Sequence, residues 1–189
     1  GKYKHEAYPT TSYGKSKKLT FNGGSIKAGL TYKITGKHIL QLNGALIDRA
    51  PSLRNSFSNA RETNAVVGEQ AGRPLNQERI TAADVSYVYR SPILTARLTG
   101  FYTHIQGANE ISFFFAEGIG GDTSSFVQEI SQNIDKEYQG VEFGFEANVL
   151  PALTLKGAAS VGRHLYANNP SVYLTSDDFG YLDLSLIHI

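Results

Sequence analysis

Residues 26–46 read IKAGLTYKITGKHILQLNGAL. In residues 26–34 every second side chain is apolar and those between are polar or glycine, which is typical of a β-strand with one apolar and one polar face. The turn Thr35-Gly36-Lys37 leads into a second, less regular run at 40–46. Nine residues is about the length that a tilted strand needs to cross a bilayer. The stretch therefore predicts a hairpin of two antiparallel membrane-spanning strands.

The same pattern occurs twice more, around the turns Ser91-Pro92-Ile93 and Leu150-Pro151-Ala152. All charged residues inside the predicted strands lie opposite the apolar face, where a polar interior would receive them. The predicted strands are residues 26–34, 40–46, 83–89, 94–103, 141–149 and 153–162. The charged residues inside them are Lys27, Lys33, Asp84, Arg97, Glu142, Glu146 and Lys156.

The connections between these pairs of strands are long and polar, at residues 48–79 and 104–139. Short turns at one end and long loops at the other are characteristic of a transmembrane β-barrel of the bacterial outer membrane. Tyr32, Tyr87 and Tyr89 lie near the short turns, as expected for an aromatic girdle at one membrane interface. We therefore predict an all-β, antiparallel barrel of about six strands, with short periplasmic turns and long extracellular loops. A soluble antiparallel sandwich would also alternate and stays open as an alternative.

Composition fits this interpretation. The chain has 189 residues, 41% of them hydrophobic, because barrel strands interleave apolar with polar residues. No apolar run approaches the roughly 18 residues of a spanning helix. The absence of cysteine removes disulfides and cysteine nucleophiles. A formal net charge of +1 argues against nucleic acid as a partner.

The sequence holds no recognisable catalytic constellation, and we predict that the protein is not an enzyme. Its histidines are far apart, without a partner at metal-ligand spacing, so no metal or other cofactor is expected. Glu142 and Glu146 share the polar face of one strand about 13 Å apart, farther than a glycosidase pair. We interpret both as charges that line the barrel interior.

Candidate ligand-binding residues lie only in the long connections. Phe113, Phe114 and Phe115 could present rings to a ligand, or could belong to a strand that continues above the membrane, which is the favoured interpretation. Arg49 and Arg54 could bind anionic groups, although such arginines are commonly solvated or paired with loop acids such as Glu78.

Three stretches resemble the barrel region of TonB-dependent outer-membrane receptors, and residues 166–174 resemble a further loop of that family. The three stretches are residues 48–59, residues 75–87 and residues 96–103. The resemblance implies a 22-stranded barrel plugged by an N-terminal domain, which takes up siderophores, cobalamin or glycans. It also implies three partners: outer-membrane lipid, a nutrient ligand, and an inner-membrane energy-coupling protein that binds the N-terminal part.

Neither the plug nor the energy-coupling motif matches any part of this chain, so the resemblance assigns no functional residue. The chain has no methionine and no signal peptide, and we expect the natural start upstream of Gly1. Residues 184–189 resemble a translated sequencing adapter, which leaves residues 1–183 as the partial barrel. The alternatives to a receptor are a passive outer-membrane channel or structural barrel, and a soluble exported sandwich that binds glycans.

Overall fold

A computed structural model of the chain describes residues 18–57, 66–67, 72–118, 125–176 and 180–183. These residues form one antiparallel sheet and a single turn of 3-10 helix, η1 (Leu53–Asn55). The strands are β1 (Gly24–Lys33), β2 (His38–Arg49), β3 (Glu78–Arg90), β4 (Leu94–Ala116), β5 (Ser125–Leu150), β6 (Leu153–Tyr166), β7 (Ser171–Ser176) and β8 (Gly180–Asp183). Among the residues that the structure describes, no helix is long and apolar enough to cross a bilayer.

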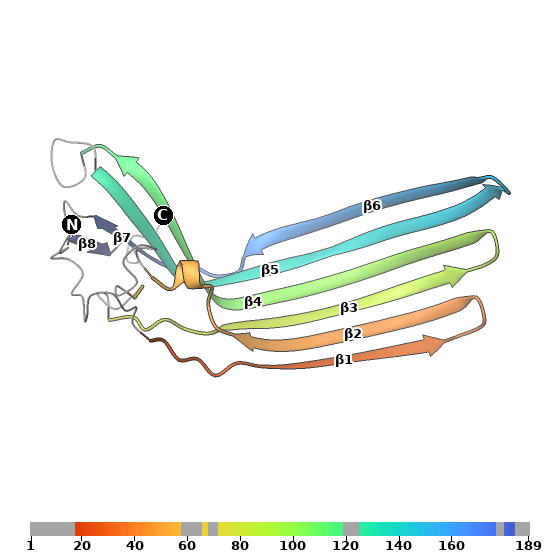
Figure 1. Cartoon of the computed structure of the whole chain (residues 1–189), viewed down its shortest axis with the longest axis horizontal. Coiled ribbons are helices and arrows are strands. Elements are labelled where there is room, and N and C mark those ends of the chain that lie inside the picture. Colours follow the sequence, from red (N-terminus) through yellow and green to blue (C-terminus); the bar gives the residue numbers. More distant parts are fainter. Residues whose placement is uncertain (1–17, 58–65, 68–71, 119–124, 177–179, 184–189) are drawn as a thin grey trace.

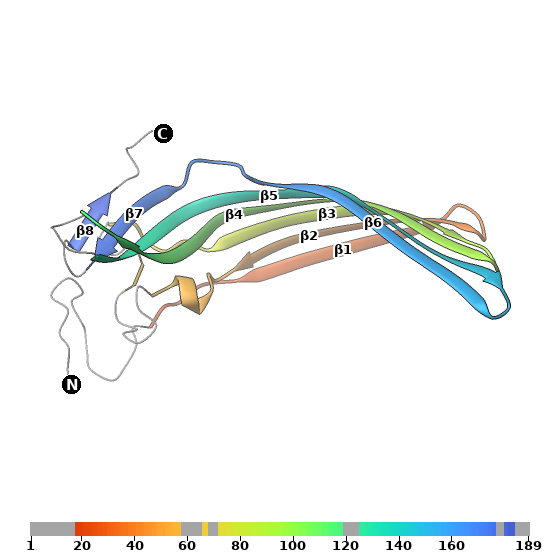
Figure 2. The same cartoon turned by 90° about the horizontal axis from the view of Figure 1, so that it is seen from above.

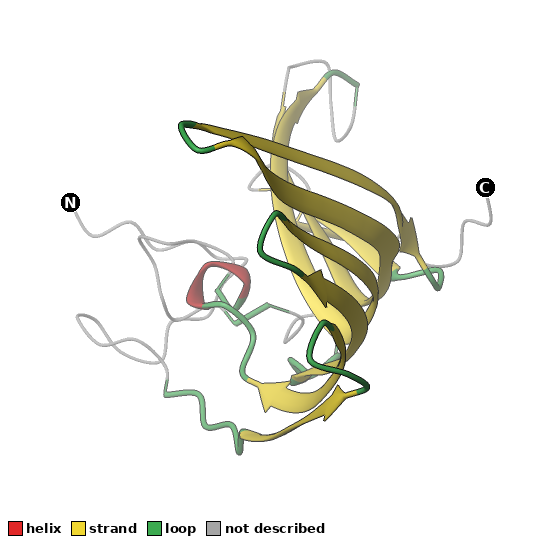
Figure 3. Ribbon diagram, turned by 90° about the vertical axis from the view of Figure 1, so that its right-hand side faces the viewer, coloured by secondary structure: helices red, strands yellow, loops and turns green. Residues whose placement is uncertain are grey.

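Strands β1 to β6 lie side by side in chain order, with the three short turns together at one end (Figure 1). At the other end β4 and β5 continue as a long hairpin, and β5 exchanges β6 for β7 as its partner. The sheet is curved and remains open within the described residues (Figures 2 and 3). The six predicted strands and their order are therefore confirmed, as part of a barrel wall.

The strand register shows the two faces more clearly than any one strand does. Residues that pair across all six strands form a row, and successive rows alternate between apolar and polar. One apolar row consists of Leu30, Leu42, Val85, Gly100, Val141 and Val161. The next row towards the short turns consists of Thr31, Gln41, Ser86, Thr99, Glu142 and Ser160.

The apolar face is uncovered. Leu30 and Val161 at the two ends of the apolar row are 62% and 73% exposed, and no second sheet packs on them within the described residues. A soluble sandwich would bury this row against a facing sheet. A cluster of buried residues instead lies at the far end, where Val67, Ile130 and Tyr173 pack with Leu75 and Ile111. The apolar row therefore has the exposure that a lipid-facing surface requires.

The ends of the strands are staggered. β1 ends in the row that joins Lys33 to Gly144, whereas β5 runs six residues past that row to Leu150. In the same way, β6 starts four residues beyond the row in which β2 starts. Each comparison spans four strand spacings, so the mean shift of the strand ends is about five residues over four spacings. At about 3.3 Å per residue and 4.8 Å per strand, the line of turns is inclined by about 40° to the perpendicular of the strands. Strands of outer-membrane barrels tilt by this amount.

Two predictions about the long connections need correction. Residues 104–139 are mostly strand, because β4 extends to Ala116 and β5 begins at Ser125. The interpretation of 113–115 as a continuing strand is therefore correct. The further loop expected at residues 166–174 is confined to residues 167–170, because Ser171–Ser176 form β7, which pairs with residues 128–132 of β5. Residues 50–77 do connect β2 and β3 without a strand of their own in the described part.

Candidate functional site

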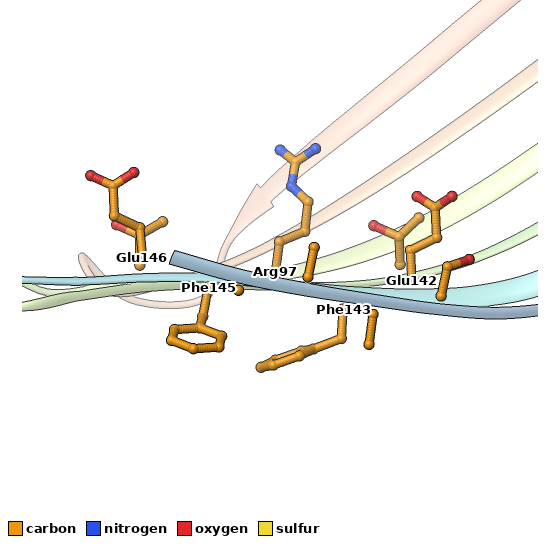
Figure 4. Close-up of a pocket in the computed structure, with 12 residues that line it drawn as sticks. Arg97, Glu142, Phe143, Phe145 and Glu146 are labelled. Atoms are coloured by element: carbon orange, nitrogen blue, oxygen red, sulfur yellow. The ribbon is translucent and has the colours of Figure 1, made fainter. Parts of the chain in front are cut away.

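The polar face of the sheet lies opposite the apolar rings. Arg97, Glu142 and Glu146 point to one side of β4 and β5, whereas Phe143 and Phe145 point to the other (Figure 4). This arrangement follows from strand alternation, and it confirms that Arg97, Glu142 and Glu146 lie opposite the apolar face.

Most polar side chains on this face contact one another across strands. Arg97 pairs with no acid among the described residues and donates instead to Gln41. Glu146 forms an ion pair with Lys156 and no reactive pair with Glu142. The contacts are Arg97 Nη2 to Gln41 Oε1 (3.0 Å), Asn43 Nδ2 to Asp84 Oδ1 (2.8 Å), Lys156 Nζ to Glu146 Oε2 (3.0 Å) and Ser86 Oγ to Thr99 Oγ1 (2.7 Å). No group of three or more His, Cys, Asp or Glu side chains that could hold a metal occurs among the described residues.

The apolar face changes character towards the long connections. From Val141 towards the long connections, the next two side chains of β5 on this face are Gln139 and Glu137. Arg163 of β6 lies on the same face, opposite Gln139. Tyr102 donates to Glu137 with an O–O distance of 3.2 Å. We call the apolar part of this face, from the short turns to the row of Val141, the apolar belt. The polar groups mark its edge towards the long connections.

Near the short turns, aromatic rings gather. His38 stacks on Tyr87 and tilts against Tyr89, and its Nδ1 lies 2.5 Å from the Tyr87 hydroxyl. Tyr32 lies in the same row as Tyr87. Tyr87 pairs with Leu98 and so lies deeper than Tyr89, but its hydroxyl contacts His38 beside the turn, as expected for a girdle residue.

The three candidate phenylalanines lie on the β4–β5 hairpin, and the structure divides them. Phe113 and Phe115 contact Phe126 of β5, with ring centroids 5.5 and 5.2 Å apart. Phe114 lies on the opposite face because side chains alternate along the strand. All three rings are exposed, from 37% for Phe114 to 73% for Phe115. Phe126 was not among the candidates from the sequence. A hairpin with its turn near residue 120 would have placed Phe126 opposite Phe115.

The two candidate arginines have different surroundings. Arg49 ends β2 and pairs with Glu78, with its Nε 2.7 Å from the carboxylate, so it is paired with an acid as such arginines commonly are. Beside it, Arg79 donates to Asp48, and this hydrogen bond lowers the pKa of the Asp48 carboxyl. Arg54 lies in η1, is exposed, and forms no ion pair with the described residues.

Arg54 lines a groove of about 330 Å³ between η1 and the β4–β5 hairpin. η1 is fixed to the edge of β4 by a hydrogen bond from Asn55 Nδ2 to the Asn109 carbonyl (2.6 Å). The lining residues are Ser52, Arg54, Asn55, Glu110, Ile111, Ser112, Glu129 and Ser131. Sequence reasoning did not place Glu110 and Glu129 beside Arg54, because that proximity depends on the hairpin register.

Both acids of the groove are held in place. Lys136 and Tyr166 both donate to Glu110, and Ser112 Oγ donates to Glu129 with a distance of 3.3 Å. Burial of Lys136 opposes its charge, but the Glu110 carboxylate outweighs this effect and raises the pKa of Lys136. Lys136 therefore stays protonated and neutralises Glu110.

A slanted antiparallel sheet with one apolar and one polar face defines the wall of an outer-membrane β-barrel. The chain belongs to the family described as TonB dependent receptor-like, beta-barrel, whose model matches residues 2–184. The family is one of outer-membrane receptors and transporters that interact with a ligand and a TonB-type partner. No curated protein and no solved structure matches the chain.

Proposed function

We propose that this chain is part of an outer-membrane receptor that takes up a scarce nutrient with energy supplied from the inner membrane. The observation that carries the proposal is the combination of a membrane-spanning wall with a recognition surface above it. The apolar row of the sheet is exposed, and the β4–β5 hairpin extends beyond the belt with exposed rings and a polar groove. Capture would take place on this hairpin, and passage would follow the polar face below.

Energy coupling separates this proposal from a passive channel with the same wall. In cells that carry the complete gene, we expect uptake of the nutrient to stop when the inner-membrane coupling protein is deleted or the proton gradient is collapsed. Binding of the nutrient to the cell surface should persist under both conditions. Uptake that continues in both would show a passive channel. We propose no catalytic role, and recovery of the nutrient unchanged inside the cell is the corresponding check.

The orientation in the membrane gives a separate prediction. Phe115 lies on the hairpin beyond the apolar belt, and Gly36 lies in a short turn at the opposite end of the strands. The chain contains no cysteine, so Phe115→Cys and Gly36→Cys each introduce one new thiol into it. On intact cells a membrane-impermeant maleimide should label position 115 and not position 36. The reverse pattern would invert the proposed topology.

A further inference from the structure

The groove between η1 and the β4–β5 hairpin has a composition that selects among nutrient classes. We infer that it binds a neutral oligosaccharide, with Phe114 as a stacking platform beside the groove. This inference rests on the proposed function, since it names the class of ligand that the receptor would capture.

The charges of the groove are balanced. Lys136 neutralises Glu110, which leaves one carboxylate, Glu129, and one guanidinium, Arg54, facing the same space. An anionic iron chelate would gain from Arg54 but would be repelled by Glu129, so it has no net electrostatic advantage there. A neutral ligand meets no such conflict.

The polar groups of the groove suit hydroxyl groups. Arg54 can only donate hydrogen bonds and Glu129 can only accept them, whereas Ser52, Ser112 and Ser131 can do both. A sugar ring presents adjacent hydroxyl groups that each donate and accept. Hydrogen bonds to charged partners are the stronger ones, so Arg54 and Glu129 would fix the orientation of the ring.

An apolar ring lies beside these groups. Phe114 is two residues beyond Ser112 on β4, so both side chains leave the same face of the hairpin. Its ring is 37% exposed, which leaves area for the C–H face of a sugar. Phe115, the next residue, leaves the opposite face and packs with Phe126. The two neighbours therefore form a matched pair for a test.

The test uses the purified full-length receptor and short neutral oligosaccharides of glucose, xylose and mannose, with binding measured by calorimetry. We expect at least one of them to bind, and Glu129→Gln and Phe114→Ala each to weaken that binding about tenfold. Phe115→Ala should leave the affinity within about twofold. A ferric catecholate chelate should not compete. If Glu129→Gln prevents barrel assembly, Ser112→Ala removes the hydrogen bond to Glu129 and should weaken binding in the same direction.

Two results would overturn the inference. The first is that none of the oligosaccharides binds. The second is that an oligosaccharide binds, but Phe114→Ala and the variant at Glu129 or Ser112 weaken its binding no more than Phe115→Ala does. Neither result touches energy coupling, because the measurement uses purified protein without an energy source. Conversely, oligosaccharide binding combined with uptake that needs no coupling protein would refute the proposed receptor mechanism and leave the ligand class intact.

Discussion

Replacing Leu98 by arginine should destabilise the full-length barrel by about 2–4 kcal/mol, the range for an arginine facing lipid near the bilayer midplane. Leu98 lies midway along the membrane part of β4, on the apolar face, and is 47% exposed in the described sheet. Its neighbour Arg97 faces the polar side and donates to the amide of Gln41. Arg97→Gln should therefore change stability by no more than about 1 kcal/mol. Urea unfolding of the receptor in lipid vesicles measures both effects.

A destabilised Leu98→Arg protein does not by itself prove contact with lipid, because a buried leucine would respond in the same way. The control is Leu98→Ala together with a fluorescent probe attached at position 98. Brominated lipid should quench that probe strongly and a probe at position 97 weakly. Equal quenching at the two positions in an assembled barrel would contradict the assignment of the two faces.

Gly140→Ala should also be strongly destabilising, by about 1–3 kcal/mol. A Cβ atom at Gly140 would lie 2.6 Å from the carbonyl oxygen of Val161 and 2.9 Å from both the Cα of Gly162 and the ring of Phe101. Two of these contacts are with backbone atoms of the neighbouring strand, which can shift only if the β5–β6 pairing opens. Heat-dependent migration of the folded barrel in detergent gels would report the loss.

Gly144 provides a matched control on the same strand and the same face. A Cβ there would meet its nearest atom, the carbonyl oxygen of Gly157, at 3.9 Å, which is an ordinary contact. Because alanine loses less conformational freedom on folding than glycine, Gly144→Ala should be neutral or slightly stabilising. If the two substitutions have the same effect, steric exclusion at Gly140 is not the reason for a glycine in that position.

The membrane part of the fold could be predicted from the sequence because its physics is local. A strand between lipid and a polar interior must alternate, so the run from Ile26 to Ile34 shows its two faces without knowledge of its neighbours. The tight turns at Gly36, Pro92 and Pro151 completed the prediction, since short connections join adjacent antiparallel strands.

The hairpin above the belt could not be predicted in the same way because its alternation is interrupted. Register shifts occur on both strands near its base, where Gly107 has φ of 70° and Asn133 has φ of 57°. Such bulges exchange the two faces of a strand, so a period-two pattern read across residues 104–138 breaks down. For the same reason Glu129 could not be placed opposite Ser112, and the groove beside Arg54 could not be foreseen from the residues alone.

The order of the strands has a kinetic consequence. The connection between β1 and β2 is four residues long, whereas the one between β2 and β3 is 28 residues long. Closing the longer loop carries an extra entropic penalty of about 1.7 kcal/mol, at about 0.6 kcal/mol per doubling of length. β1 and β2 should therefore form early as one unit and β3 to β6 as another, because the three connections within β3–β6 are at most eight residues long. The wall would then form when these two preformed units dock through the pairing of β2 with β3.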